Sequence, residues 1–181
     1  MQNGISSFPA FVFVAAMAFI LYSTPASACT GMVIKGDDGT VVYGRTQEWS
    51  MFDFKTQATV YPEGKSFQAL TPEGKNGISW DAKYGFLSFL LLDKVTGDGM
   101  NEKGLAAGSF YHPGFAEYGE YDPSLARKSM APTNVVNYIL SNFATIEEVR
   151  KGMQEVRVVP VKNPDIGEVP PVHFFVADPS G

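Results

Sequence analysis

The chain has 181 residues and a formal net charge of −5, from 19 acidic and 14 basic side chains. No basic excess is available to neutralise phosphates, so nucleic-acid binding is not expected. A single cysteine, Cys29, excludes an intrachain disulfide.

Residues 1–28 differ in composition from the rest of the chain. They contain no charged side chain, and residues 8–22 are almost wholly apolar. This run is shorter than the ~20 apolar residues that a membrane-spanning helix needs. Ala26-Ser27-Ala28 follows it and fits the small-residue pattern of a signal-peptide cleavage site. We expect residues 1–28 to be a signal peptide and the mature protein to be periplasmic or secreted. A buried helix or an uncleaved anchor is the alternative.

The first part of the mature chain reads as strands. Residues 30–35 and 40–45 are strand-like runs joined by Gly36-Asp37-Asp38-Gly39, which predicts a hairpin. A strand is expected over 56–61, and a buried one over 84–92. The glycine-rich stretch 97–104 has turn composition and leads into the strand-like run 105–111. We therefore predict a second hairpin over 84–111.

Helix signals follow. One helix is expected to begin near Pro132-Thr133, and a second at Thr145, which forms a capping box with Glu148 and leads to a helix ending near Glu155. Strands are predicted over 156–161 and 172–177. The chain then ends in a turn sequence, Asp178 to Gly181, and a strand entering a turn at this point indicates a piece of a longer protein.

Cleavage after Ala28 would make Cys29 the first residue of the mature chain. It would then carry a thiol and a free α-amine, and α-amines titrate near pH ~8. A neutral amine can take the thiol proton directly or through a water, so one residue supplies both nucleophile and base. No histidine is then required. His173 is interpreted as structural, and His112 as a loop residue that could line a pocket.

At these residues the sequence resembles a known family, the choloylglycine hydrolases, which include conjugated bile salt hydrolases and penicillin V acylases. The resemblance rests on four pieces in order over residues 29–181: Cys29-Thr30-Gly31; Tyr43-Gly44-Arg45 with Glu48-Trp49; Asn101-Glu102-Lys103-Gly104-Leu105; and the run from His173 to Asp178. It implies an α+β fold, the four-layer αββα sandwich of N-terminal nucleophile hydrolases, here with only its N-terminal portion. Residues 29–181 would form that portion of a single hydrolase domain.

The resemblance assigns roles to four residues. Cys29 matches the nucleophile, and Arg45 the arginine beside it, whose positive charge favours the thiolate. Glu48 stands where most members carry Asp, and its carboxylate would orient the amine and hold Arg45. Tyr111 matches a pocket position near the oxyanion site, where penicillin V acylases tend to carry Tyr and bile salt hydrolases Asn. A core aromatic is the alternative for Tyr111.

The resemblance implies hydrolysis of a linear amide, penicillin V or another acyl-amide, through a thioester on Cys29, without metal or organic cofactor. Bile salts and acyl homoserine lactones are alternative substrates. Full-length members are often tetramers, so a homo-oligomer is expected. Members run to nearly twice this mature length, so we expect the 181-residue chain alone to be insoluble or inactive.

A second class of function is a lipid-anchored binding protein. A cysteine directly after a signal peptide can be lipidated, which would block its α-amine. The motif around Cys29 and the spacing to Arg45 have no role in a lipoprotein, so we expect the membrane to be met only in transit.

Overall fold

The structure is a computed structural model that describes residues 29–48 and 53–181. The predicted signal peptide (1–28) and Trp49 lie outside the described residues. Within the described ranges, no helix is long and apolar enough to cross a bilayer.

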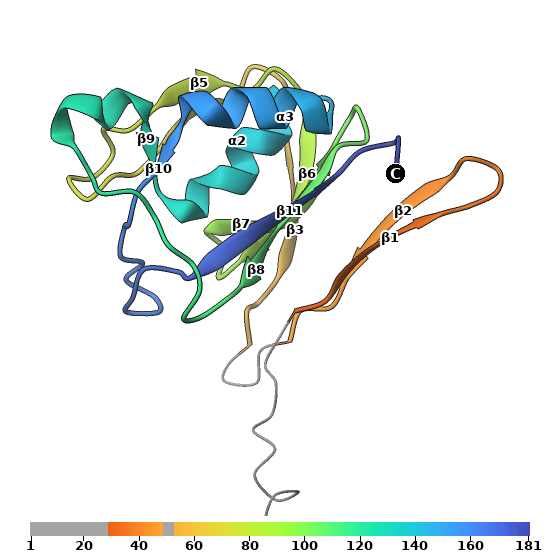
Figure 1. The fold of residues 1–181 in the computed structure, drawn as a ribbon, viewed down its shortest axis with the longest axis horizontal. Helices are drawn as coiled ribbons and strands as arrows, with labels where there is room; N and C mark the ends of the chain where they lie inside the picture. The colour runs from red at the N-terminus through yellow and green to blue at the C-terminus, as the bar shows by residue number, and fades with distance from the viewer. Residues whose placement is uncertain (1–28, 49–52) are drawn as a thin grey trace, which may run out of the picture.

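Helices cover one face of a five-stranded antiparallel sheet, and a separate hairpin lies on the other side (Figure 1). Neighbouring strands of the sheet run in the order β11-β8-β7-β6-β3. The strands are β3 (Gln57–Tyr61), β6 (Phe86–Leu91), β7 (Val95–Asn101), β8 (Ala106–Tyr111) and β11 (Val172–Ala177).

The separate hairpin is formed by β1 (Gly31–Lys35) and β2 (Val41–Arg45), which confirms the first predicted hairpin. It packs across β8 and β11. The Tyr43 ring stacks on Phe175 with ring centroids 5.7 Å apart. A Cβ at Gly31 would lie 2.7 Å from Phe110 Cζ, so this close approach of strand to ring requires glycine.

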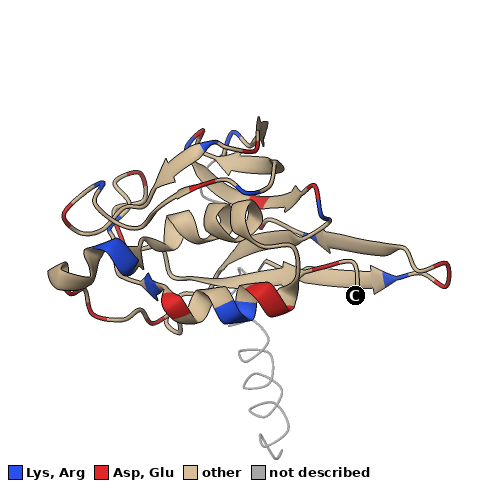
Figure 2. Cartoon of the chain, turned by 90° about the horizontal axis from the view of Figure 1, so that it is seen from above, with Lys and Arg blue, Asp and Glu red and all other residues tan. Residues whose placement is uncertain are grey.

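The two predicted helices are α2 (Val135–Asn142) and α3 (Ile146–Gly152). At the start of α3, Thr145 Oγ1 accepts a hydrogen bond of 3.2 Å from the Glu148 amide, as the capping box predicts. Figure 2 shows acidic and basic residues on α3, which has acidic side chains in its first turn and basic ones in its last. This distribution complements the helix dipole.

The hydrophobic core lies between the helices and the sheet. Leu105 on the sheet side and Leu140 on α2 are both 0% exposed. The buried members of this core are Ala69, Phe86, Leu105, Ala107, Met130, Val135, Val136, Ile139, Leu140 and Val149.

Short elements complete the chain. The strand expected over 156–161 is limited to two residues that pair in parallel with a short strand before α2. The short strands are β4 (Ser66–Gln68), β5 (Ser79–Asp81), β9 (Ser129–Met130) and β10 (Arg157–Val158), and the 3₁₀ helices are Pro123–Lys128, Pro132–Asn134 and Met153–Glu155.

The predicted second hairpin is wrong, because the glycine-rich stretch taken as its turn is strand β7. Residues 84–111 form three strands, with tight turns at Leu92-Asp93 and at 102–104. A Cβ at Gly97 would lie 2.8 Å from Leu91, and one at Gly99 would lie 2.6 Å from Leu140. These glycines therefore allow close packing inside a strand and do not make a turn.

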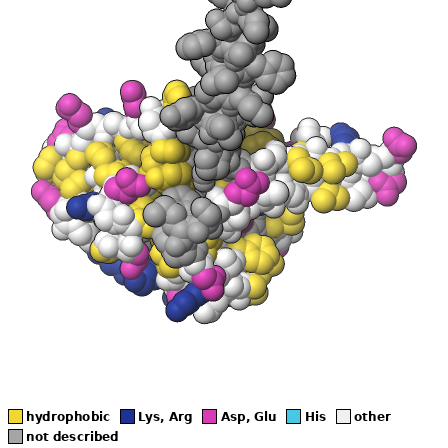
Figure 3. Space-filling model, turned by 90° about the horizontal axis from the view of Figure 1, so that it is seen from below, with side chains coloured by type: hydrophobic (Ala, Val, Ile, Leu, Met, Phe, Trp, Pro, Cys, Tyr) yellow, Lys and Arg dark blue, Asp and Glu magenta, His cyan; other side chains and the backbone are white. Residues whose placement is uncertain are grey.

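The face of the sheet away from the helices is only partly covered. Val60 is 72% exposed and Phe89 is 43% exposed. Figure 3 shows apolar side chains on the body and on the projecting hairpin. The exposed large apolar side chains are Val60, Leu87, Phe89 and Met100 on the sheet, and Met32, Ile34 and Val42 on the hairpin.

Candidate active site

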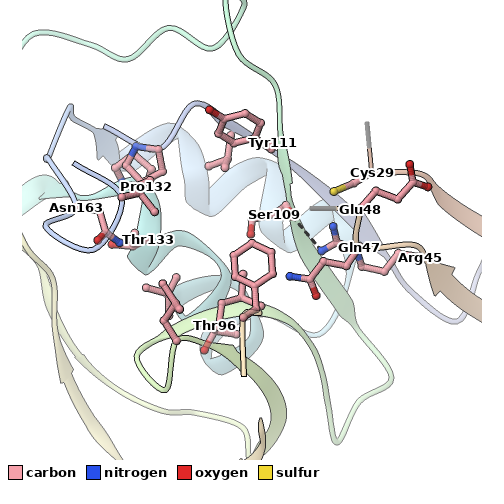
Figure 4. A pocket seen from close by; sticks show the side chains of 17 residues that line it. Cys29, Arg45, Gln47, Glu48, Thr96, Ser109, Tyr111, Pro132, Thr133 and Asn163 are labelled. Atoms are coloured by element: carbon pink, nitrogen blue, oxygen red, sulfur yellow. Dashed lines mark hydrogen bonds between the residues drawn. The ribbon is translucent and has the colours of Figure 1, made fainter. Parts of the chain in front are cut away.

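A cavity of about 100 Å³ brings together the four residues singled out in the sequence. Cys29, Arg45 and Glu48 line it from the hairpin and the residues flanking it, and Tyr111 from the end of β8 (Figure 4). They are separated by up to 82 positions in the chain (111 − 29), and the packing of β1–β2 on β8 joins them.

Cys29 is half-buried and precedes β1. Its neighbour Thr30 is held by Thr46 through two hydrogen bonds. The Thr30 amide donates to Thr46 Oγ1 at 3.0 Å, and the Thr46 amide donates to the Thr30 carbonyl at 2.9 Å. The position of Cys29 therefore depends on the end of β2.

Arg45, the last residue of β2, is buried, with 9% of its side chain exposed. Its Nη1 forms an ion pair with Asp98 Oδ2 and donates to the Ser109 carbonyl at 3.1 Å. The guanidinium carbon lies 4.3 Å from the centroid of the Phe110 ring, a cation–π geometry. Arg45 Nε also donates to the Thr46 carbonyl at 3.1 Å, so three hydrogen bonds and a ring contact fix the guanidinium.

Glu48, which we expected to hold Arg45, makes no ion pair with it in the described part of the chain. Among the described residues, the carboxylate paired with Arg45 is Asp98. Glu48 is exposed, and Figure 4 shows its carboxylate near Cys29 and directed away from the guanidinium. The physical reason is that a buried guanidinium needs a buried partner, which Asp98 supplies from β7.

Asp98 lies in a polar cluster that the sequence interpretation missed. Its Oδ1 accepts a 3.0 Å hydrogen bond from the Tyr43 hydroxyl, and its Oδ2 faces Arg45. Burial raises the pKa of Asp98, and the Arg45 charge and the Tyr43 hydroxyl work against that rise. Burial and the Asp98 charge likewise raise the pKa of Tyr43. The signal that could have identified Asp98 as a site residue is its position between two glycines in a buried strand.

Tyr111 lines the cavity, but its hydroxyl is directed elsewhere. It donates a 2.9 Å hydrogen bond to Glu168 Oε1, and Figure 4 shows the hydroxyl pointing away from Cys29. Burial, the hydrogen bond to Glu168 and its charge raise the pKa of Tyr111, so the hydroxyl stays protonated at neutral pH.

Most of the remaining cavity wall is apolar. It comes from the turn between β6 and β7, from Phe54, and from the loop before β11. The apolar lining residues are Phe54, Leu91, Leu92, Val95, Pro132, Ile166, Pro170 and Val172. Such a lining suits an apolar group of a substrate, with polar side chains beside Cys29 and Arg45 and also at Thr96, Thr133 and Asn163.

The two histidines do not line this cavity. The His112 ring lies 4.9 Å from the ring centroids of both Phe115 and His173. His173 also packs on Phe110 at 5.6 Å. Both act as aromatic packing groups, and no cluster of three or more metal-ligating side chains occurs in residues 29–48 and 53–181.

The chain is similar to known proteins in both sequence and fold. The model of the linear amide C–N hydrolases, choloylglycine hydrolase family, matches residues 29–181. A protein of Paramecium bursaria Chlorella virus 1 is 33% identical over 84% of this chain and 46% of its own length. The penicillin V acylase of Pectobacterium atrosepticum is 26% identical over 91% of this chain and 45% of its own. The chain thus spans about half the length of these curated relatives.

Solved structures agree in fold. The conjugated bile acid hydrolase of Clostridium perfringens superposes with a TM-score of 0.70 at 22% identity, over 85% of this chain and 46% of that one. The penicillin V acylase of Agrobacterium tumefaciens gives a TM-score of 0.68 at 28% identity, over 83% and 44%. These neighbours confirm the predicted α+β fold class. The chain belongs to the choloylglycine hydrolase family of linear amide C–N hydrolases.

Proposed function

We propose that this polypeptide is the nucleophile-bearing part of a cysteine N-terminal nucleophile amidohydrolase, with Cys29 as the first residue of the mature protein. One observation carries the proposal: Cys29 lies with the buried Arg45 at one side of a cavity whose other walls are mostly apolar.

In the proposed reaction the Cys29 α-amine takes the thiol proton, and the sulfur attacks the amide carbonyl. The C–N bond then breaks, and the amine returns the proton to the departing nitrogen. Water attacks the resulting thioester, with the α-amine as base, and releases the acid and the free thiol. Glu48 is proposed to orient the α-amine.

The apolar wall supports a substrate with an apolar acyl group. We propose penicillin V or another acyl-amide, with bile salts and acyl homoserine lactones as competing substrates. Tyr111 is proposed to bound the acyl site. A hydroxyl has one proton to donate, and that of Tyr111 is donated to Glu168. Tyr111 could therefore donate to the oxyanion only after this hydrogen bond breaks.

The test uses the protein expressed from its complete gene. Its intact mass is measured first. We expect a chain that begins at an unmodified Cys29, in a periplasmic or secreted fraction. A mass raised by lipid would favour the lipid-anchored alternative, and retention of residues 1–28 would leave Cys29 without a free α-amine, so either result overturns the proposal.

Hydrolysis of penicillin V, glycine-conjugated bile salts and acyl homoserine lactones is then compared with that of Cys29→Ser. We expect a loss of at least about 100-fold, since an alcohol is a much weaker nucleophile at neutral pH. A correctly processed Cys29→Ser protein as active as the parent would contradict the proposal. Assembly as a tetramer stays a prediction, to be measured by sedimentation of the same sample.

A further inference from the structure

The cluster of Tyr43, Arg45 and Asp98 connects the hairpin to the five-stranded sheet. Arg45 and Asp98 expose only 9% and 10% of their side chains. The carboxylate receives both the Arg45 guanidinium and the Tyr43 hydroxyl, so each of its oxygens has a protein donor. Tyr43 and Arg45 lie two positions apart on β2, and therefore on the same face of that strand.

The sheet leaves room for this cluster at one position. Gly108 pairs with Asp98 across β8 and β7. A Cβ at Gly108 would overlap Asp98 Oδ1 and the Tyr43 hydroxyl. Any side chain at position 108 would therefore displace the Asp98 carboxylate and the Tyr43 hydroxyl.

The cluster also determines where Cys29 lies. Thr46, directly after Arg45, holds Thr30 through two hydrogen bonds, and Cys29 precedes Thr30. Arg45 in turn is held by Asp98 and by the Ser109 carbonyl. The chain of contacts runs from the sheet through Asp98 and Arg45 to the nucleophile, with no other ion pair on that path among the described residues.

Charge gives Asp98 a second effect. A lone guanidinium beside a thiol attracts the thiolate, but a paired carboxylate cancels much of that attraction. We propose that Asp98 is a positioning residue of the Cys29 site, which anchors the Arg45 guanidinium and balances its charge, with Tyr43 as its second donor. This inference rests on the proposed function for its effect on catalysis, but not for its effect on the thiol.

The experiment uses the protein expressed from its complete gene and follows alkylation of Cys29 by iodoacetamide as a function of pH, with the labelled peptide identified by mass spectrometry. In Asp98→Asn the Arg45 charge is unbalanced, so we expect the midpoint of the alkylation profile to move to lower pH. We expect kcat for amide hydrolysis to fall by about 10- to 100-fold, because the guanidinium loses its anchor.

Three further variants keep the test decisive. Arg45→Gln leaves Asp98 unbalanced and should move the midpoint to higher pH. The double variant Arg45→Gln/Asp98→Asn removes both charges and should return it close to that of the parent, which also answers the case in which Asp98→Asn alone does not fold. Asp81→Asn removes an exposed carboxylate bound to Ser66, outside the cavity lining, and serves as the charge control with an unchanged midpoint and kcat.

The readouts separate the two proposals. A parent that hydrolyses no amide, but whose midpoint shifts in Asp98→Asn as expected, would overturn the proposed function and support the role of Asp98. An active parent with the same midpoint in Asp98→Asn, or with equal midpoints in Arg45→Gln and the double variant, would overturn the role of Asp98. A purely structural role would lower folded yield without these opposite shifts.

Discussion

The two faces of the five-stranded sheet are built differently. The face under α2 and α3 is closed and mainly apolar, with Leu105 and Leu140 fully buried. Its buried polar side chains, such as Ser88 and Thr96, are hydrogen-bonded. The opposite face carries a buried ion pair under the hairpin and exposed side chains beyond it, such as Phe89 at 43%. The comparison indicates that stability comes mainly from the helix side, whereas the hairpin side carries the candidate chemistry.

The largest effect should separate the two faces directly. In the protein expressed from its complete gene, Leu140→Ala should lower the free energy of unfolding by about 3 kcal/mol, because it leaves a cavity in a closed core. The matched change Leu87→Ala should lower it by about 1 kcal/mol or less, since Leu87 is already 39% exposed. Urea unfolding measures both. Equal losses would mean that the two faces are packed alike.

The next effect tests the packing of the hairpin. Gly108→Ala should lower the free energy of unfolding by about 2 kcal/mol, because its Cβ meets Asp98 and Tyr43. Gly119→Ala is the matched control, since its nearest heavy atom outside its neighbours lies 3.9 Å from the new Cβ. If thermal unfolding showed the same small change in both variants, the hairpin would not be held as described.

A smaller effect concerns the junction between the end of β11 and α3. Asp178 accepts hydrogen bonds of 2.9 Å from the amides of Ile146 and Ser180, and these donors hold the pKa of Asp178 below its usual 3.8. A carboxylate whose pKa is lower when folded stabilises the protein above pH 3.8, and this contribution is lost as the pH falls through the folded value. Asp178→Asn should therefore lower the free energy of unfolding by about 1 kcal/mol at pH 7. That difference should shrink in acid, and a constant difference from pH 7 to pH 3 would contradict the assignment.

The smallest effect should come from His173 on β11, whose ring packs on Phe110 and His112. Burial and the nearby His112 lower the pKa of His173 below 6.5. The unfolded chain then binds a proton more readily than the folded one, so this contribution to stability is present above pH 6.5 and is lost as the pH falls through the folded value. His173→Gln should flatten the pH dependence of the melting temperature between pH 7 and pH 5. An unchanged slope would show that His173 does not titrate differently on folding.

Local sequence patterns predicted most of the scaffold. Alternating residues around an Asp-Gly turn were enough for β1 and β2, and Thr145 with Glu148 for the start of α3. Strand β7 was missed because Gly97-Asp98-Gly99 has the composition of a turn, and the neighbours that require these glycines lie elsewhere in the chain. The partner of Arg45 was missed for the same reason, since Asp98 lies 53 positions away. Motif resemblance identified the cavity residues Cys29, Glu48 and Tyr111, but not the direction in which each side chain points.

The turn between β6 and β7 has a further consequence. Leu92 and Asp93 have φ angles of 53° and 58°, a left-handed conformation that a leucine adopts only at a cost of about 1 kcal/mol. Leu92 also lines the cavity. Leu92→Asn would suit this backbone better and place a polar amide on an apolar wall. Selection for thermostability alone would therefore favour substitutions at position 92 that weaken binding of an apolar acyl group. Engineering of this protein should keep Leu92 unchanged.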